Sequence, residues 1–380
     1  MDRNRPLFQG ARLRLARTFH GLTLAELGEQ VSASRQYMQR LESEPEVAPS
    51  RDMLHAIAET LSVEPPFFFE PLAGEVREEE CHFRKLHTTP LNMRIRALSN
   101  GTIFNLLVSY IEQELELPKI NIPFIQVKNR EDIEKAAEKC RQLWGLYIDA
   151  PIHNMTRTLE RVGCVVTTFE GVSEEIDAFS YFRSRPIIVR NTAKNSTSKL
   201  RFDLAHECGH LVMHSNLEVG DSVLEEQANQ FASAFLLPRI AFVKEFPKTN
   251  RFDWNKIFQL KKRWGVSIQA IVKRAYDLGL INAVQYRNAY VHISRKGWKR
   301  AEPPKTEPAS EPIEIIPVAF DLLKQHRGLT ITEIAHNLYL KCSILKRFGI
   351  FCKNSESITT AKKIIPVKEH PMKHIKININ

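Results

Sequence analysis

The stretch Arg201-Phe-Asp-Leu-Ala-His206-Glu207-Cys208-Gly209-His210-Leu-Val-Met-His214 decides how the rest of this sequence is interpreted. Its centre reads His-Glu-x-x-His. On an α-helix, residues four apart lie one turn apart on the same face, so His206 and His210 can offer two imidazoles to one metal ion. Glu207, next to the first histidine, is then placed to act as a general base.

An apolar stripe indicates that this stretch is a helix packed on one side. Its members recur at spacings of four, four and three residues, which is the helical period: Leu200, Leu204, Cys208 and Leu211. The histidines and their neighbouring glutamate lie mostly off the stripe, so we expect one side to be buried and the other to face a cleft. One of three hydroxyl residues caps the start: Ser196, Thr197 or Ser198.

A second predicted helix supplies a candidate third ligand. The run 224–238 begins with acidic residues and ends at a proline, which cannot continue a helix. A catalytic zinc takes three protein ligands and keeps a fourth position open. Glu225 is our candidate for the third ligand, ahead of Glu226, and Asn229 lies one turn later as a partner for a ligating histidine. The alternative is that both glutamates only complement the helix dipole.

Together the two motifs resemble those of the ImmA/IrrE metallopeptidases, cytoplasmic proteases of bacteria, phages and mobile elements. The likeness rests on Ala-His-Glu-Cys-Gly-His-Leu-Val-Met-His and on Glu-Glu-Gln-Ala-Asn-Gln-Phe-Ala-Ser-Ala-Phe-Leu-Leu-Pro, within residues 130–300. Cys208 departs from the aliphatic residue that the family often carries there. The resemblance implies one catalytic carboxylate and three metal ligands: Glu207, and His206, His210 and Glu225.

The first part of the chain predicts a small helical domain. A helix over residues 6–20 is followed by a capping box, in which Thr23 and Glu26 satisfy each other's backbone donors. A short turn leads to a polar helix capped by Ser34, and another helix spans residues 51–62. The run Thr-Leu-Ala-Glu-Leu-Gly-Glu-Gln-Val-Ser-Ala-Ser-Arg-Gln-Tyr-Met-Gln-Arg-Leu-Glu resembles the helix-turn-helix of the phage-repressor (XRE-like) family.

That resemblance places the second helix of the pair in the major groove of duplex DNA. Arg35 and Gln36 are our first candidates for base contacts, because arginine suits guanine and glutamine suits adenine. Gln39 and Arg40 can reach bases or phosphates, and Ser34 can reach a phosphate. The alternative is a domain that binds protein or dimerises, because the segment that follows is strongly acidic.

Composition narrows the class of protein. A chain of 380 residues allows two or three domains, and its net charge of +10 favours nucleic acid or acidic partners. No run of eighteen apolar residues predicts a membrane span, and no apolar signal segment follows the first residues. The six cysteines are scattered without a Cys-x-x-Cys, which is typical of the reducing cytoplasm. We therefore expect a cytoplasmic protein with no membrane partner.

The expected fold is multidomain: an all-α helix-turn-helix domain, followed by an α+β zincin-like metallopeptidase domain with a small sheet and the His-Glu-x-x-His helix. Three β-branched and aromatic runs predict a small antiparallel sheet: residues 163–169, 177–183 and 186–191. The predicted divisions are the helix-turn-helix domain, an acidic linker with connecting helices, the metallopeptidase domain, and a proline-rich linker with a small helical module: 1–68, 69–130, 131–300 and 301–380.

The sequence thus predicts a metal-dependent endopeptidase fused to a DNA-binding domain and acting in transcriptional regulation. Zn²⁺ best suits two histidines and one glutamate, and Mn²⁺ is the alternative. The expected partners are operator DNA and a protein substrate, which the resemblance implies is a transcriptional repressor. If the operator consists of two paired half-sites, the protein would bind it as a homodimer.

Three questions stay open at this level. His214, one turn beyond His210, is either an oxyanion stabiliser or a packing histidine. The whole protein is alternatively a DNA-binding regulator whose metal site is structural or sensory. A third reading is one member of a toxin–antitoxin or mobile-element pair.

Overall fold

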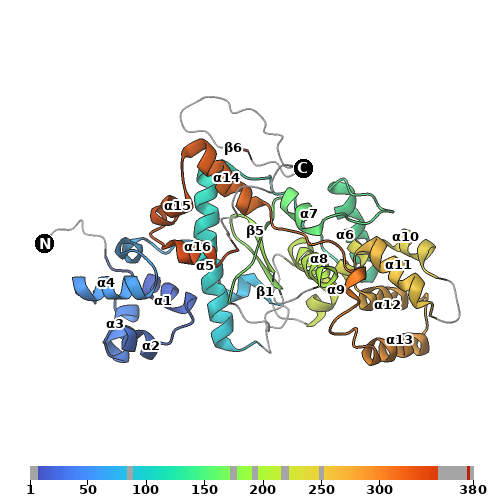
Figure 1. The fold of residues 1–380 in the computed structure, drawn as a ribbon, viewed down its shortest axis with the longest axis horizontal. Helices are drawn as coiled ribbons and strands as arrows, with labels where there is room; N and C mark the ends of the chain where they lie inside the picture. The colour runs from blue at the N-terminus through green and yellow to red at the C-terminus, as the bar shows by residue number, and fades with distance from the viewer. Residues whose placement is uncertain are drawn as a thin grey trace.

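A computed structural model shows a mainly helical protein arranged about one long helix. It describes residues 7–83, 89–171, 178–190, 196–214, 222–247, 252–349 and 375–376. The long helix is α5 (Leu91–Glu114), and the N-terminal helices lie on one side of it, with the sheet and most other helices on the other (Figure 1). Within the ranges just given, no helix is long and apolar enough to cross a membrane.

Four helices form the N-terminal unit: α1 (Gly10–Phe19), α2 (Leu24–Gln30), α3 (Arg35–Ser43) and α4 (Arg51–Thr60). The predicted capping box is present at α2, and the Ser34 hydroxyl accepts a hydrogen bond from the Tyr37 backbone N–H at the start of α3. The turn between α2 and α3 is tight. A Cβ on Gly28 would lie 2.6 Å from the Ala33 carbonyl oxygen, so a larger residue there would force the turn open.

The sheet contains the three predicted strands and one more. Its members are β1 (Cys81–Phe83), β3 (Val165–Thr167), β4 (Ala178–Phe182) and β5 (Pro186–Arg190). Their order is β1-β4-β5-β3, and β4 is antiparallel to both of its neighbours. The predicted all-antiparallel sheet is wrong for β3, which runs parallel to β5. Because β1 takes the outer edge of β4, β3 lies on the outer edge of β5, and the chain crosses over between β3 and β4.

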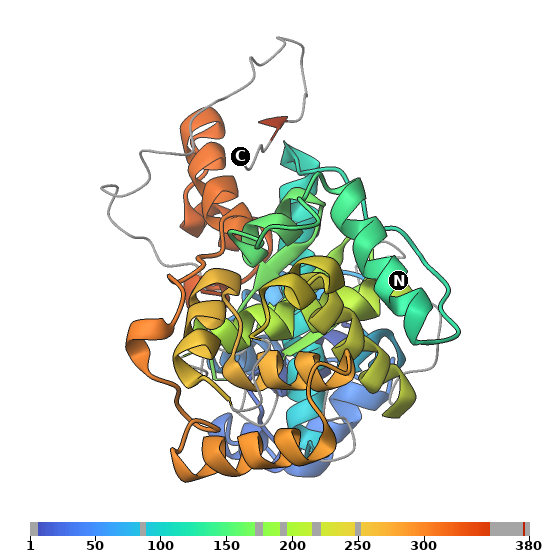
Figure 2. The same ribbon diagram turned by 90° about the vertical axis from the view of Figure 1, so that its right-hand side faces the viewer.

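Most of the remaining helices lie beyond the sheet. They are α6 (Arg130–Leu143), α7 (Met155–Arg161), α8 (Thr197–Met213), α9 (Ser222–Leu236), α10 (Arg239–Glu245), α11 (Trp254–Trp264), α12 (Ile268–Asp277) and α13 (Ala283–Arg295). Figure 2, viewed from their side, shows α10 to α13 in gold and orange in front of α8 and the green strands. The helices α8 and α9 thus lie between the sheet and an outer helical layer.

The sheet separates two hydrophobic cores, because successive strand residues face opposite sides. Phe179 and Tyr181 join the core on the α5 side, whereas Val166 and Ile188 join the core that contains α8. Ser180, between Phe179 and Tyr181 in sequence, is fully buried and therefore faces α8. The alternation of β4 thus places one hydroxyl against that helix.

Three C-terminal helices pack back onto the N-terminal unit: α14 (Ile315–Arg327), α15 (Ile331–Asn337) and α16 (Cys342–Lys346). Val63, just after α4, forms a β-bridge with Leu340. The backbone N–H of Glu64 donates to the Tyr339 carbonyl at 2.8 Å. The C-terminal helical module and the N-terminal unit therefore share one hydrophobic core.

Residues 328–348 repeat the backbone pattern of residues 21–41 without a gap. Each segment starts with a left-handed glycine and continues with a threonine–glutamate capping box. The turn that follows contains one left-handed residue other than glycine, Ser32 at φ 55° and Tyr339 at φ 56°. The C-terminal copy differs in its last helix, where Ile344 and other apolar residues turn into the core.

The proline-containing segment before α14, predicted as a linker, is held against the helices by glutamates. Each of three glutamates accepts a hydrogen bond from a backbone N–H at the start of a helix: Glu302 from Ile268 of α12, Glu307 from Ser198 of α8, and Glu311 from Met155 of α7. Acidic groups stabilise helix N-termini. The buried Lys261 ammonium also lies 2.7 Å from Glu302. This segment therefore fixes the starts of three helices.

Candidate metal centre

The helix α8 carries the centre and is buried on both sides. Its start is capped by the Ser196 hydroxyl, which accepts a hydrogen bond from the Lys199 N–H. Three residues of the predicted apolar stripe are buried in the core, Leu204, Cys208 and Leu211, and the fourth, Leu200, is half-buried. The polar side is buried as well, with exposed fractions of 0% for His206, 0% for Glu207 and 1% for His210. The histidine side therefore faces protein, not the open cleft that its polarity predicted.

Small residues bring α9 close to α8. A Cβ on Gly209 would lie 3.1 Å from the Phe231 ring and 3.3 Å from the Cα of Ala228. Ala228 and Ala232 are fully buried at this contact. The close approach brings the first turn of α9, which carries Glu225, within reach of the α8 histidines.

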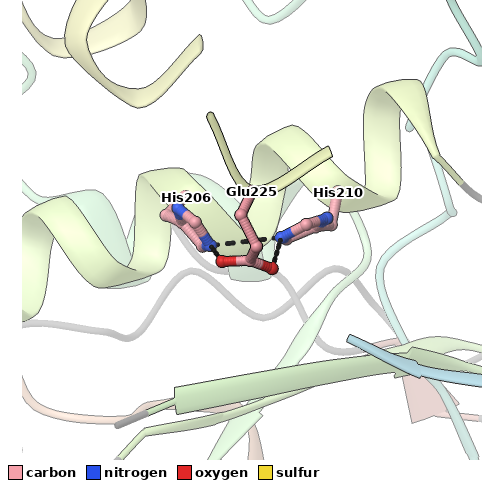
Figure 3. Close-up of side chains that lie close together, drawn as sticks. All are labelled: His206, His210 and Glu225. Carbon is pink, nitrogen blue, oxygen red and sulfur yellow. Dashed lines mark hydrogen bonds and ion pairs between the residues drawn. The ribbon is translucent and has the colours of Figure 1, made fainter. Parts of the chain in front are cut away.

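Three side chains from these two helices converge on one point. Figure 3 shows His206, His210 and Glu225 pointing toward one another, on the side of α8 where the strands run. The two histidine Nε2 atoms lie 3.1 Å apart. The Glu225 carboxylate oxygens lie 3.3 Å from the His206 Nε2 and 3.1 Å from the His210 Nε2. These are the three predicted ligands, and they form the one His/Cys/Asp/Glu cluster of metal-binding geometry among the residues that the structure describes.

The spacing and chemistry of these donors fit a divalent cation. Ligand bonds of about 2.0–2.1 Å in tetrahedral zinc place neighbouring donor atoms roughly 3.3 Å apart. The measured separations are 3.1, 3.1 and 3.3 Å. Two unprotonated Nε2 atoms this close repel each other unless a positive charge lies between them. Two imidazoles and one carboxylate suit zinc and also admit manganese.

Asn229 orients the first histidine, as its position one turn after Glu225 predicted. Its side-chain oxygen lies 3.1 Å from the Nδ1 of His206. An amide oxygen only accepts, so Nδ1 carries the proton and Nε2 keeps its lone pair for the cation.

His214 orients the second histidine in the same manner. Its Nε2 lies 2.9 Å from the Gln227 side-chain oxygen and its Nδ1 lies 3.0 Å from the Nδ1 of His210. Because the Gln227 oxygen accepts, His214 carries its proton on Nε2 and its Nδ1 accepts from His210. Burial lowers the pKa of His214, which keeps this ring neutral. Of the two roles considered for His214, that of oxyanion stabiliser is not supported, because its two ring nitrogens already contact the side chains of His210 and Gln227.

Glu225 is held as a carboxylate. Its two oxygens face the Nε2 atoms of His206 and His210, so a cation held between the three groups would favour the ionised form. The adjacent Glu226 is exposed and accepts a hydrogen bond from Gln230 instead. Of the two glutamates considered for the third ligand, only Glu225 lies in the cluster.

Glu207 contacts the sheet. The Ser180 hydroxyl of β4 donates to a Glu207 carboxylate oxygen at 2.6 Å, and both side chains are fully buried. This bond fixes the carboxylate next to the histidine ligands. A carboxylate held there can accept a proton from an attacking water and return it to a leaving group.

The predicted site residues thus come together in two separate places. Glu207, the three ligands and Asn229 meet between α8, α9 and β4. Sequence reasoning missed Ser180 and Gln227. A serine at the centre of the apolar strand Ala-Phe-Ser-Tyr-Phe was a signal for the first, whereas nothing in the sequence distinguished Gln227 from other polar residues of α9.

The candidate DNA contacts lie on α3, in the N-terminal unit. Arg35, Gln36, Gln39 and Arg40 are all exposed, and Ser34 is the N-cap. Arg40 pairs with Glu44 at 3.2 Å across an exposed surface, a contact that solvent weakens. The side chains on the exposed face of α3 are therefore available to a partner.

In a comparison with known families, residues 159–276 match the model of the Peptidase_M78 family, described as an IrrE N-terminal-like domain. The matched range contains all three candidate ligands and Glu207, and it supports the ImmA/IrrE resemblance. No curated protein matches the chain. The cluster described above therefore lies within the range that is similar to this peptidase family.

Proposed function

We propose that this protein is a metal-dependent endopeptidase whose catalytic residues lie between α8, α9 and β4. The main support is that the Nε2 atoms of His206 and His210 and the Glu225 carboxylate lie within 3.3 Å of one another. A second carboxylate, that of Glu207, lies beside them and is hydrogen-bonded to Ser180. A bound divalent cation would polarise the scissile carbonyl and lower the pKa of water.

The chain's own residues have distinct roles in this proposal. His206, His210 and Glu225 hold the cation. Asn229 and His214 fix the tautomers that leave each Nε2 unprotonated. Because Glu207 is the carboxylate beside this cluster that does not ligate, it takes the proton of the attacking water and passes it to the leaving amine.

We further propose that the N-terminal unit binds duplex DNA through α3. Support comes from the capped α2 and α3, the tight turn at Gly28, and the exposed Arg35, Gln36 and Gln39. Such a helix places its first residues at base edges in the major groove. The substitutions Arg35→Ala and Gln36→Ala would then each weaken binding to the operator more than binding to unrelated DNA.

A protease joined to a DNA-binding unit fits a role in transcriptional regulation, with a repressor as the substrate and a homodimer on paired half-sites. The ImmA/IrrE resemblance suggests this substrate class. Zinc is the proposed cofactor, with manganese the alternative.

The test is cleavage of the repressor encoded beside this gene, with zinc, with manganese and with a chelator. We expect metal-dependent cleavage by the wild type and a loss of about 10²-fold or more in Glu207→Gln, which lacks the proton acceptor. Metal content measured in both proteins is the control. Equal cleavage by the two proteins would contradict the role of Glu207.

The burial of the ligands favours a second candidate, a DNA-binding regulator whose metal holds α8 and α9 together. His206 and His210 are 0% and 1% exposed, which is unusual for a centre that must admit a peptide. In that case the Glu207→Gln protein would regulate its operator normally. The Glu225→Gln protein would lose its bound metal and would be less stable.

A further inference from the structure

An endopeptidase must hold its substrate as an extended chain, and the edge of a sheet is a general way to do so. β4 is the strand whose Ser180 contacts the proposed base, Glu207. One edge of β4 is covered by β5 through five paired residues, and the other by β1 through three. The second edge is the one on which a peptide could add.

We propose that β1 occupies the substrate-binding edge of β4 and keeps the centre closed until β1 is displaced. This inference rests on the proposed peptidase function. The register pairs His82 with Ser180. Paired residues of an antiparallel ladder have Cα atoms about 4.5–5.5 Å apart. The β1 backbone therefore lies one strand spacing from the residue bonded to Glu207, where a substrate strand would lie.

Surface ion pairs hold the acidic segment that leads into β1. Glu78 pairs with Arg94 of α5, and Glu80 lies 2.7 Å from Arg183 in the turn after β4. The side chains of Glu80 and Arg183 are still 29% and 26% exposed, so water and salt weaken their attraction. Contacts of this kind hold a short strand reversibly.

The attachment of β1 is firmer on its N-terminal side. Val76 is 3% exposed, and its backbone N–H donates to the Thr102 hydroxyl at 3.0 Å. Release of the strand would therefore begin after Val76. Only the stretch carrying Glu78 to Phe83 needs to leave the edge of β4 for a peptide to enter.

The experiment compares two matched charge reversals in the full-length, zinc-loaded protein. Glu80→Lys breaks the pair with Arg183 at 2.7 Å. Glu79→Lys makes the same charge change at a residue whose ion pair among the described residues is an exposed one, to Arg77 at 4.0 Å. Two readouts are measured: the labelling rate of the buried Cys81 thiol, and the cleavage rate of fluorescein-labelled casein. Both should rise about three- to tenfold in Glu80→Lys and change less than about twofold in Glu79→Lys.

A disulfide that holds β1 on the edge of β4 tests the opposite effect. Tyr181→Cys places a thiol directly opposite Cys81 in the ladder, at a Cα separation that a disulfide can span. In the Glu80→Lys background, oxidation should abolish the gain in cleavage and a phosphine reductant should restore it. Tyr181→Ser in the same background forms no disulfide, so its cleavage rate should change with neither treatment.

To distinguish access to the edge of β4 from catalytic turnover, casein binding is measured in Glu207→Gln and in the double variant with Glu80→Lys. Increased binding without cleavage in any variant would keep the role of β1 and reject the peptidase. Faster labelling of Cys81 with unchanged binding and cleavage would overturn the proposal. Unchanged labelling of Cys81 would overturn it as well, since β1 would then be fixed in place. Cleavage of the chain itself within residues 76–90 would also overturn it, since β1 would then be a substrate.

Discussion

At the scale of single residues, the proposed metal centre should owe part of its affinity to His214, which is not one of the three proposed ligands. Its Nδ1 accepts a hydrogen bond from the Nδ1–H of His210, and its Nε2–H donates one to the side-chain oxygen of Gln227. We expect His214→Ala to lower zinc affinity about 10- to 100-fold with the fold retained. The measurement is competition with a chromogenic chelator. Glu226→Gln, on the exposed side of α9, is the control, and full affinity in His214→Ala would contradict the assignment.

Glu160 gives stability a pH dependence. Burial raises its pKa to about 8, against hydrogen bonds from the backbone N–H groups of Ile315 and Glu314 that lower it. A carboxyl with a raised pKa in the folded state stabilises most below its ordinary pKa of 4.5, and this contribution is lost as the pH rises toward 8. The free energy of unfolding of Glu160→Gln, measured in urea, should therefore fall less than that of the wild type between about pH 5 and pH 8. The exposed Glu46→Gln should keep the wild-type slope.

At the scale of elements, the α8–α9 contact sets the distance between Glu225 and the histidines. Gly209→Ala adds a methyl group 3.1–3.3 Å from Phe231 and Ala228, so α9 must shift by a few tenths of an ångström. Overpacking of about 1–3 kcal/mol outweighs the gain of about 1 kcal/mol in helix propensity. We expect lower stability in urea together with weaker zinc binding. Asn288→Ala, on the exposed face of α13, should change neither, and a more stable Gly209→Ala would show that the contact is loose.

The elements also show what sequence could and could not predict. Caps and apolar periodicity are local, so α2, α3 and α8 lie where Thr23, Ser34 and Ser196 predicted. The placement of His206 and His210 on one face followed from helical spacing for the same reason, whereas Glu225 lies on a different helix. The strand β1 has only three residues and follows a polar segment, so it has no periodic signal. Its pairing with β4, and the contact of Ser180 with Glu207, depend on tertiary packing that no local pattern contains.

At the scale of the whole molecule, the C-terminal helices link parts that are far apart in sequence. The segment 328–348, which repeats the backbone pattern of residues 21–41, ends by packing inward between α1, α5 and the loop after β3. Phe348 is 2% exposed, with ring centroids 5.1 Å from Phe104, 5.5 Å from Phe169 and 6.1 Å from Phe19. One side chain thus joins the N-terminal unit, the central helix and the loop after β3.

This position predicts that the N-terminal unit and the catalytic part unfold together. Phe348→Ala should destabilise the protein by about 3–5 kcal/mol, because it leaves a cavity among three aromatic rings. In differential scanning calorimetry we expect one transition in the wild type, and in the variant a lower Tm with a separate early transition of the N-terminal helices. Lys346→Ala, two residues earlier and exposed, is the control. Two transitions in the wild type would mean that the shared core does not couple the two parts, and the N-terminal unit would then be independent of the proposed metal centre.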